Sequence, residues 1–134
     1  MSDHPLQHWH RVVSERNTRG IDALLADEVI FHSPVVHTPQ AGRMLTRMYL
    51  SAAMQVLANA SFRYVREVVD GRDAVLEFEV DVDGVQINGV DMIKWNDAGQ
   101  IVSFKVMVRP LKAIHLLQEK MAALLQTARN DPRL

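Results

Sequence analysis

Four segments in the second half of the chain alternate between apolar and polar residues, which is the pattern of half-buried β-strands. In one of them Leu76, Phe78 and Val80 share a face, and Glu77 and Glu79 share the other. The connectors DGRD, DG and NDAG are hairpin-turn signals. The pattern therefore predicts an antiparallel meander with one face on a core and one face partly solvated. Its strands are residues 61–69, 74–82, 85–95 and 100–108.

Apolar residues at helical spacing predict helices on both sides of this meander. The first is marked by Pro5 in its first turn and by the stripe Leu6, Trp9, Val12 and Val13. A last helix begins at Pro110, and residues 130–134 after it are expected to be a frayed tail. The predicted helices are residues 5–17, 21–27, 43–58 and the segment that follows Pro110.

Residues 28–33 have strand character, and Pro34 ends that strand or places it at a sheet edge. The loop 34–42 holds two prolines and a glycine, and irregular segments of this kind often carry function. Helices on one face of an antiparallel sheet define the α+β class. We expect one such domain over residues 1–134.

The length and composition of the chain make several classes of function unexpected. The chain has 134 residues, a net charge of -1 and no cysteine, so thiolate chemistry and a basic nucleic-acid surface are not expected. The start of the chain lacks the features of a signal peptide, and no apolar run approaches the ~20 residues of a membrane span. We expect a cytoplasmic protein with no membrane partner.

The stretch VDMIKWNDAGQI, residues 90–101, contains the strongest candidate for chemistry. Strand alternation places Asp91 on the same face as the apolar Ile87, Ile93 and Trp95. A carboxyl group on an apolar face has a specific partner or stays protonated, because burying an unpaired charge is too unfavourable. A structural aspartate, or one turned to solvent by a bulge at Gly89, is the alternative.

Two stretches resemble the nuclear-transport-factor-2-like superfamily, which includes ketosteroid isomerases, SnoaL-like polyketide cyclases, dehydratases and non-catalytic association modules. They are IDALLADEVIFHSPVVHTPQAGRMLTRMYL (21–50) and VDMIKWNDAGQIVSFKVMV (90–108). The resemblance implies a cone, in which a curved antiparallel sheet wraps around a long helix, with an extra helix at the C-terminal end. It also implies an apolar pocket in the cone and a homodimer through the outer sheet face.

In this resemblance, Asp91 corresponds to the protonated aspartic acid of ketosteroid isomerases. Ser33 stands where those enzymes have their proton-shuttling aspartate, and serine is no base at neutral pH without an activating partner. Val12 and Val13 stand where their oxyanion tyrosine would be. The standard ketosteroid isomerase mechanism is therefore not expected.

Two histidines flank the Pro34 loop and are further catalytic candidates. His32 or His37 could form an acid–base pair with Asp91, because histidine titrates near neutrality. The alternative for both is a position at the rim of the cone. A metal site is not expected, because their spacing is not a known ligand motif. Tyr49 could donate to a ligand oxygen or could be a core tyrosine.

Besides Tyr49, the side chains expected to line the ligand pocket are one serine and several large apolar residues. They are Ser33, Trp9, Met48, Phe62, Phe78, Trp95 and Phe104. The alternative for the apolar residues is a place in the core, where such residues usually lie. No organic cofactor is expected, because there is no glycine-rich phosphate loop.

Two functions stay open at this point. One is a binding protein or enzyme for an apolar, oxygen-bearing ligand, such as a polycyclic or steroid-like carbonyl compound, with proton transfer next to the carbonyl (isomerase, cyclase or dehydratase). The other is a non-catalytic association or carrier module whose cone is filled by its own side chains. Water addition by an Asp-Arg-Asp set ranks lowest, because alternation puts Arg109 on the outer face.

Overall fold

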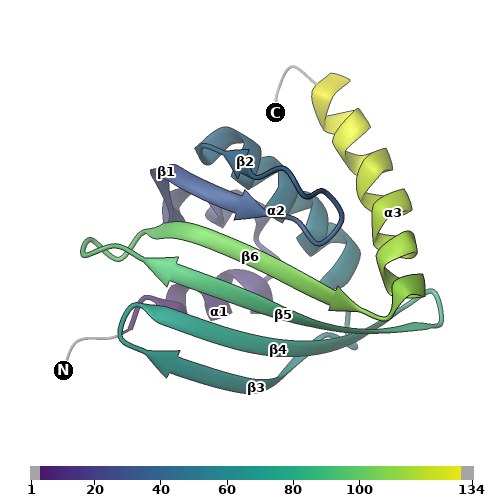
Figure 1. Ribbon diagram of the computed structural model, residues 1–134, viewed down its shortest axis with the longest axis horizontal. Helices are drawn as coiled ribbons and strands as arrows, with labels where there is room; N and C mark the ends of the chain where they lie inside the picture. Colours follow the sequence, from purple (N-terminus) through teal and green to yellow (C-terminus); the bar gives the residue numbers. More distant parts are fainter. Residues whose placement is uncertain (1–3, 131–134) are drawn as a thin grey trace.

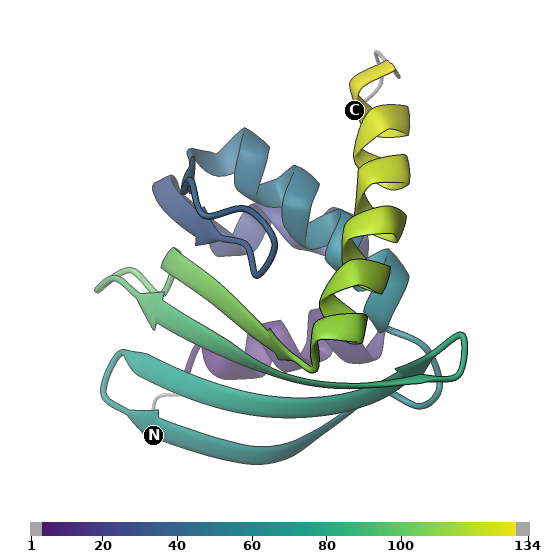
Figure 2. The same ribbon diagram turned by 45° about the vertical axis from the view of Figure 1, so that its right-hand side comes forward.

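A computed structural model describes residues 4–130. Its centre is one six-stranded sheet in the order β2-β1-β6-β5-β4-β3, strongly curved and concave towards the helices (Figures 1 and 2). The meander expected from the alternation is present as four long antiparallel strands. The strands are β1 (Leu25–His32), β2 (Gln40–Ala41), β3 (Arg63–Asp70), β4 (Asp73–Val82), β5 (Val85–Trp95) and β6 (Ile101–Arg109).

The helices lie on the concave side and at one end of the sheet (Figure 2). Helix α1 (Leu6–Ser14) buries Leu6, Trp9 and Val12 of the predicted stripe, and Val13, its fourth member, is half-buried. Helix α2 (Arg43–Leu57) packs on β1, and α3 (Leu111–Asn130) packs on α2 and on the ends of β5 and β6. Short 3-10 turns η1 (Thr18–Gly20) and η2 (Asp22–Leu24) join α1 to β1.

The structure is the α+β cone that the resemblance implies, with two local differences. The sheet is mixed, because β1 pairs with β6 in parallel, so it is not antiparallel throughout. The predicted helix at 21–27 is one 3-10 turn, and β1 already begins at Leu25. Leu25 and Val29 are completely buried in this strand, and this tertiary packing overrides a short apolar pattern that fits a helix equally well. Of the expected tail at 130–134, Asn130 is the last residue of α3 (Leu111–Asn130), and residues 131–134 lie outside the described residues.

A β-bulge in β3 changes which side chains enter the cone. Tyr64 pairs with Phe78 and Arg66 with Glu77, so Val65 is the extra residue between the two pairs. Before the bulge, Phe62 and Tyr64 face inwards. After the bulge the alternation is shifted by one residue, so that Glu67 lies opposite the buried Leu76. Among residues 4–130, no helix is long and apolar enough to cross a membrane.

Candidate functional site

Asp91 lies on the concave side of β5, in the middle of the sheet. Its partners in register are Leu76 on β4 and Val106 on β6, both buried. Asp91 itself is only 6% exposed, so strand alternation placed it on the correct face. It is the one buried carboxyl group among the residues whose burial the structure describes, which makes it the natural centre of a site.

A short chain of hydrogen bonds ends at this carboxyl group. The Tyr64 hydroxyl donates to Asp91 Oδ2 at 2.6 Å, and Trp9 Nε1 donates to the same hydroxyl at 2.9 Å. The three residues come from β5, β3 and α1. Because the indole fills one acceptor position of the hydroxyl, the Tyr64 proton is directed at Asp91. Within the described chain, Tyr64 is the only side chain hydrogen-bonded to Asp91.

Burial controls the protonation of both groups. Removal from water raises the pKa of Asp91 to about 7, against a smaller lowering by the Tyr64 hydrogen bond. The pKa of Tyr64 is raised well above its usual value, first by burial and then by the nearby Asp91 charge. Near neutral pH, Asp91 can therefore take up or release a proton, while Tyr64 stays protonated and acts as a donor.

A small cavity adjoins Asp91 inside the cone. Its volume is about 50 Å³, enough for a group of a few heavy atoms. The lining is apolar and aromatic except for Asp91, the Tyr64 hydroxyl and the Trp9 indole N–H. The lining residues are Trp9, Val13, Leu50, Ala53, Met54, Leu57, Ala58, Phe62, Tyr64, Phe78, Asp91, Phe104 and Val106.

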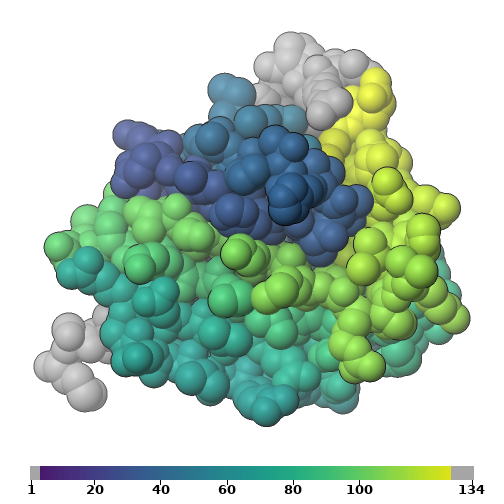
Figure 3. All heavy atoms as spheres, viewed as in Figure 1, coloured from purple at the N-terminus to yellow at the C-terminus, as the bar shows by residue number. Residues whose placement is uncertain are grey.

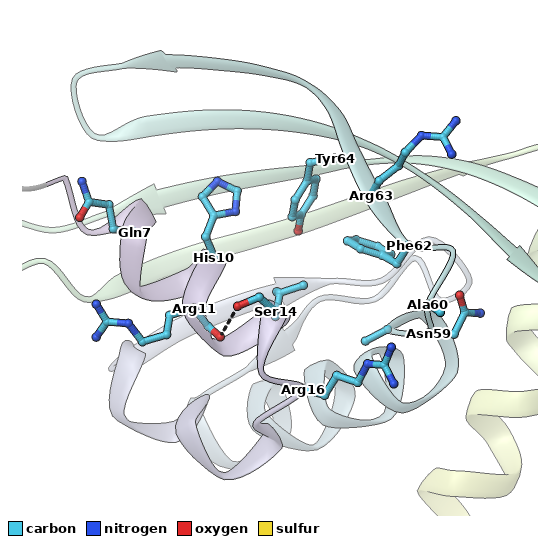
Figure 4. A pocket seen from close by; sticks show the side chains of 12 residues that line it. Gln7, His10, Arg11, Ser14, Arg16, Asn59, Ala60, Phe62, Arg63 and Tyr64 are labelled. Atoms are coloured by element: carbon cyan, nitrogen blue, oxygen red, sulfur yellow. Dashed lines mark hydrogen bonds between the residues drawn. The ribbon is translucent and has the colours of Figure 1, made fainter.

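A much larger hollow of about 670 Å³ lies outside this cavity, between α1, the end of α2 and the start of β3 (Figure 4). Val13, Ala58, Phe62 and Tyr64 border both spaces. These shared residues form the boundary between solvent and Asp91. A ligand that enters from the hollow would reach the carboxyl group past Phe62 and Tyr64.

Aromatic contacts hold the walls of the cavity in place. Phe62 stacks on Phe78 with ring centroids 5.3 Å apart and meets Tyr64 edge to face at 5.1 Å. On the other side, Trp9 meets Phe104 edge to face at 4.9 Å. Such contacts restrict the rotamers of the rings, so the direction of the Tyr64 hydroxyl is fixed by packing as well as by hydrogen bonds.

The structure brings together some of the expected ligand-binding residues. Trp9, Phe62, Phe78 and Phe104 border the cavity with Asp91.

Three others lie away from the cavity, and two of them are in the core. Tyr49 is buried against Phe31 at a ring distance of 5.7 Å. Trp95 is buried and meets His4 edge to face at 5.0 Å. Met48 is half-buried on α2 and, like Tyr49 and Trp95, does not border the cavity.

The structure does not bring His32, Ser33 or His37 to Asp91. They line a separate hollow of about 370 Å³ together with Lys105, and this hollow shares only Val106 with the cavity of Asp91. The Ser33 hydroxyl accepts hydrogen bonds from the backbone of Val35 and Val36, so it shapes the turn after β1. The acid–base pair that the sequence allowed between a histidine and Asp91 is therefore not present in this geometry.

Tyr64 is the site residue that sequence reasoning missed. The first helix lacks the expected tyrosine, and the structure supplies a hydroxyl from β3 instead. Strand alternation puts Phe62 and Tyr64 on one face, which was the available signal. The hydrogen bond between Tyr64 and Asp91 depends on the bulge at Val65 and on the strand register. Neither can be predicted from the alternation of apolar and polar residues. No group of three or more metal-ligating side chains occurs within the described residues.

Comparison with known proteins shows the family of this chain. Residues 6–104 match the SnoaL-like domain, so the chain belongs to that family and to the nuclear-transport-factor-2-like superfamily. No curated protein sequence matches the chain.

Among solved structures, the chain is similar to a steroid delta-isomerase from Pseudomonas aeruginosa. The two are 36% identical with a TM-score of 0.88, and the match covers 95% of this chain and 93% of that one. A bacterial protein of cystatin-like fold from Silicibacter pomeroyi is 34% identical with a TM-score of 0.82, over 89% of this chain and 83% of that one. A putative polyketide cyclase from Sinorhizobium meliloti shares the fold at 14% identity and a TM-score of 0.62, over 79% and 95% of the two chains.

Proposed function

We propose that the protein binds a small apolar ligand through a carbonyl group and transfers a proton next to that carbonyl, in the manner of an isomerase or cyclase. One observation carries the proposal: Asp91, with a pKa of about 7, borders an apolar cavity and accepts a hydrogen bond from Tyr64. The similarity to a steroid delta-isomerase supports the same class of chemistry.

Asp91 both accepts and returns the proton in this proposal. Ionised Asp91 removes a proton from the carbon next to the carbonyl, and the electron pair of the C–H bond moves to the carbonyl oxygen as the enolate forms. If the ligand has a double bond next to that carbon, the protonated carboxyl group delivers the proton to the far end of the double bond, the carbonyl re-forms and the double bond moves next to it. In a ketone without this double bond, the proton returns to the carbon from which it came. Tyr64 stays protonated throughout and stabilises the ionised carboxylate, since its own pKa is far above neutrality. The proposal does not involve His32 or His37, which lie in the separate hollow.

The two spaces divide the ligand into two parts. The inner cavity of about 50 Å³ accepts a carbonyl and its neighbouring carbon but no ring system. A polycyclic or steroid-like body would lie in the outer hollow of about 670 Å³, against the face of Phe62. This arrangement keeps the reacting carbon dry while most of the ligand remains at the mouth of the cone.

A binding measurement tests the proposal. Thermal unfolding of the wild type is followed with 2-acetylnaphthalene, an apolar ketone, and with 2-ethylnaphthalene, which lacks the oxygen. A ligand at ~100 times its Kd adds roughly 2.7 kcal/mol to the stability of the native state. The measurement is made at about pH 6, below the pKa of about 7, where Asp91 is protonated and can donate to the ketone oxygen. We expect stabilisation by the ketone only, and we expect Asp91→Leu, which removes this donor, to abolish it. Equal stabilisation by both compounds would contradict a role for Asp91 in recognising the carbonyl.

A non-catalytic carrier is the second candidate function. The observation that favours it is that, in the part of the chain that the structure describes, Asp91 and Tyr64 are the only ionisable side chains lining the inner cavity. A carrier would need Asp91 only as a hydrogen-bond donor, so the isosteric Asp91→Asn variant would still bind the ketone. Proton exchange on the bound ketone separates the two functions, because a carrier binds without exchange.

We also propose a homodimer through the outer sheet face. Val68, Val75 and Met92 lie side by side across β3, β4 and β5, and each is more than a third exposed. Met107 on β6 is 51% exposed on the same side. Figure 3 shows this side of the molecule, where β3 to β6 are not covered by α1 or α2. A second copy would remove these side chains from water.

A further inference from the structure

We infer that the outer hollow is a binding subsite for an anionic group, so that the ligand has an apolar carbonyl end and a carboxylate at its other end. This assignment rests on the proposed function only for the carbonyl end. The anion subsite itself is a property of the hollow and can be tested alone.

The charges around the hollow are of one sign. Among residues 4–130, its lining contains Arg11, Arg16, Arg63 and His10 and no carboxylate side chain. Two of these side chains already contact a carboxylate, because Arg63 lies 2.8 Å from Glu79 and His10 lies 2.6 Å from Glu67.

Arg11 and Arg16 have no ion-pair partner within residues 4–130. The net positive charge of the hollow therefore comes from these two arginines. A hollow with uncompensated guanidinium groups and no acid attracts anions.

Arg16 is the better placed of the two. It follows α1 in the left-handed region, at a φ of 52°, in the turn that ends the helix. Figure 4 shows its side chain extending towards Asn59 and Ala60, whereas Arg11 extends away from them towards the start of α1. Arg16 thus lies on the same side of the hollow as the boundary with the inner cavity.

One ligand can occupy both spaces. Phe62 and Val13 border the hollow and the inner cavity, so the apolar surface is continuous from Arg16 to Asp91. Arg63 also lies on the Asn59 side, but it is paired with Glu79, so the Arg16 guanidinium is the one on that side without a carboxylate contact within the described residues, and it matches one negative charge. This favours a carboxylate over a phosphate dianion, and an Arg–carboxylate contact can be bidentate.

The test uses 2-naphthoate and its uncharged analogue 2-naphthamide, with calorimetric titration and NMR of the arginine Nε–H groups. We expect the wild type to bind the acid about fivefold more tightly than the amide, with a shift at Arg16 that 0.5 M NaCl reduces. Arg16→Gln should bring the two affinities together. Arg19→Gln is the matched control, because Arg19 is also exposed and unpaired within the described chain but does not line the hollow, and it should keep the preference.

Equal affinity for acid and amide in the wild type, no binding of either, or a preference that survives Arg16→Gln would each overturn the inference. The test of the proposed function and the test of the anion subsite can fail independently of each other. Asp91→Asn should leave the preference for 2-naphthoate unchanged, and Arg16→Gln should leave the binding of 2-acetylnaphthalene and its oxygen dependence unchanged.

Discussion

Tyr64 and Asp91 are 27 positions apart in the chain, and the hydroxyl of the first donates a 2.6 Å hydrogen bond to the carboxyl group of the second. They lie on strands that are not neighbours, since β4 separates β3 from β5. The curvature of the sheet brings the tyrosine over the aspartate. The Trp9 indole then fixes the hydroxyl from the opposite wall of the cone.

Removing the Tyr64 hydroxyl should change both neighbours. Tyr64→Phe leaves the Trp9 N–H without its acceptor, and we expect a loss of roughly 1–3 kcal/mol in the free energy of unfolding. The pKa of Asp91 should rise further, because the Tyr64 hydrogen bond lowers it. Chemical denaturation and ¹³C NMR of the Asp91 carboxyl group measure the two effects. Tyr49→Phe is the control, since Tyr49 is buried without a side-chain hydrogen bond in the described structure; an equal effect there would contradict this account.

The burial of Asp91 predicts a specific pH dependence of stability. Its pKa is raised from 3.8 in the unfolded chain to about 7 in the folded protein, so the folded state binds the proton more tightly. The stabilisation from protonation is fully present below about pH 4 and is lost progressively as the pH rises from about 4 through 7.

Asp91→Asn resembles the protonated form and does not titrate. The stability of this variant relative to the wild type should therefore increase by about 1.4 kcal/mol per pH unit between pH 4 and 7 and then level off, for roughly 4 kcal/mol in total. Urea unfolding at several pH values measures the difference, with Asp73→Asn as the control for replacing an exposed carboxylate on β4. A difference that is constant with pH would mean that Asp91 is not buried as a lone carboxyl group.

Gly89 makes room for an aromatic wall of the cavity. A Cβ at this position would lie 2.7 Å from Cε2 of Phe78, its partner in register, and Phe78 is itself stacked on Phe62. We expect Gly89→Ala to destabilise the protein by about 1–3 kcal/mol through overpacking. Displacement of the two rings should also weaken the binding of 2-acetylnaphthalene. Unchanged stability and affinity would show that the rings can move freely.

The proposed dimer makes its own prediction. Met107→Glu places a charge on the exposed outer face, about half exposed in the single chain, and should shift sedimentation towards the monomer. Met44→Glu, on an exposed part of α2 away from that face, is the matched control and should not. A wild type that sediments as a monomer at all concentrations would contradict the dimer.

The sequence predicts the positions of some residues of the site and not of others. Alternation in residues 85–95 places Ile87, Gly89, Asp91, Ile93 and Trp95 on the buried face, because a regular strand keeps its period of two. The same rule applied to 61–69 fails after Val65, where the bulge inserts one residue. The distance of His37 from Asp91 depends on the conformation of an irregular loop, for which the sequence has no period.

The most direct test of the account is the exchange of the methyl protons of 2-acetylnaphthalene for deuterium in D₂O, followed by ¹H NMR. If Asp91 takes up protons next to a bound carbonyl, wild-type protein should accelerate the exchange over buffer. Asp91→Asn should remove the acceleration while the ketone still binds, and the rate should rise as the pH passes through about 7, where Asp91 ionises. Exchange at the buffer rate with bound ketone, or equal acceleration by the Asp91→Asn variant, would contradict proton transfer at Asp91.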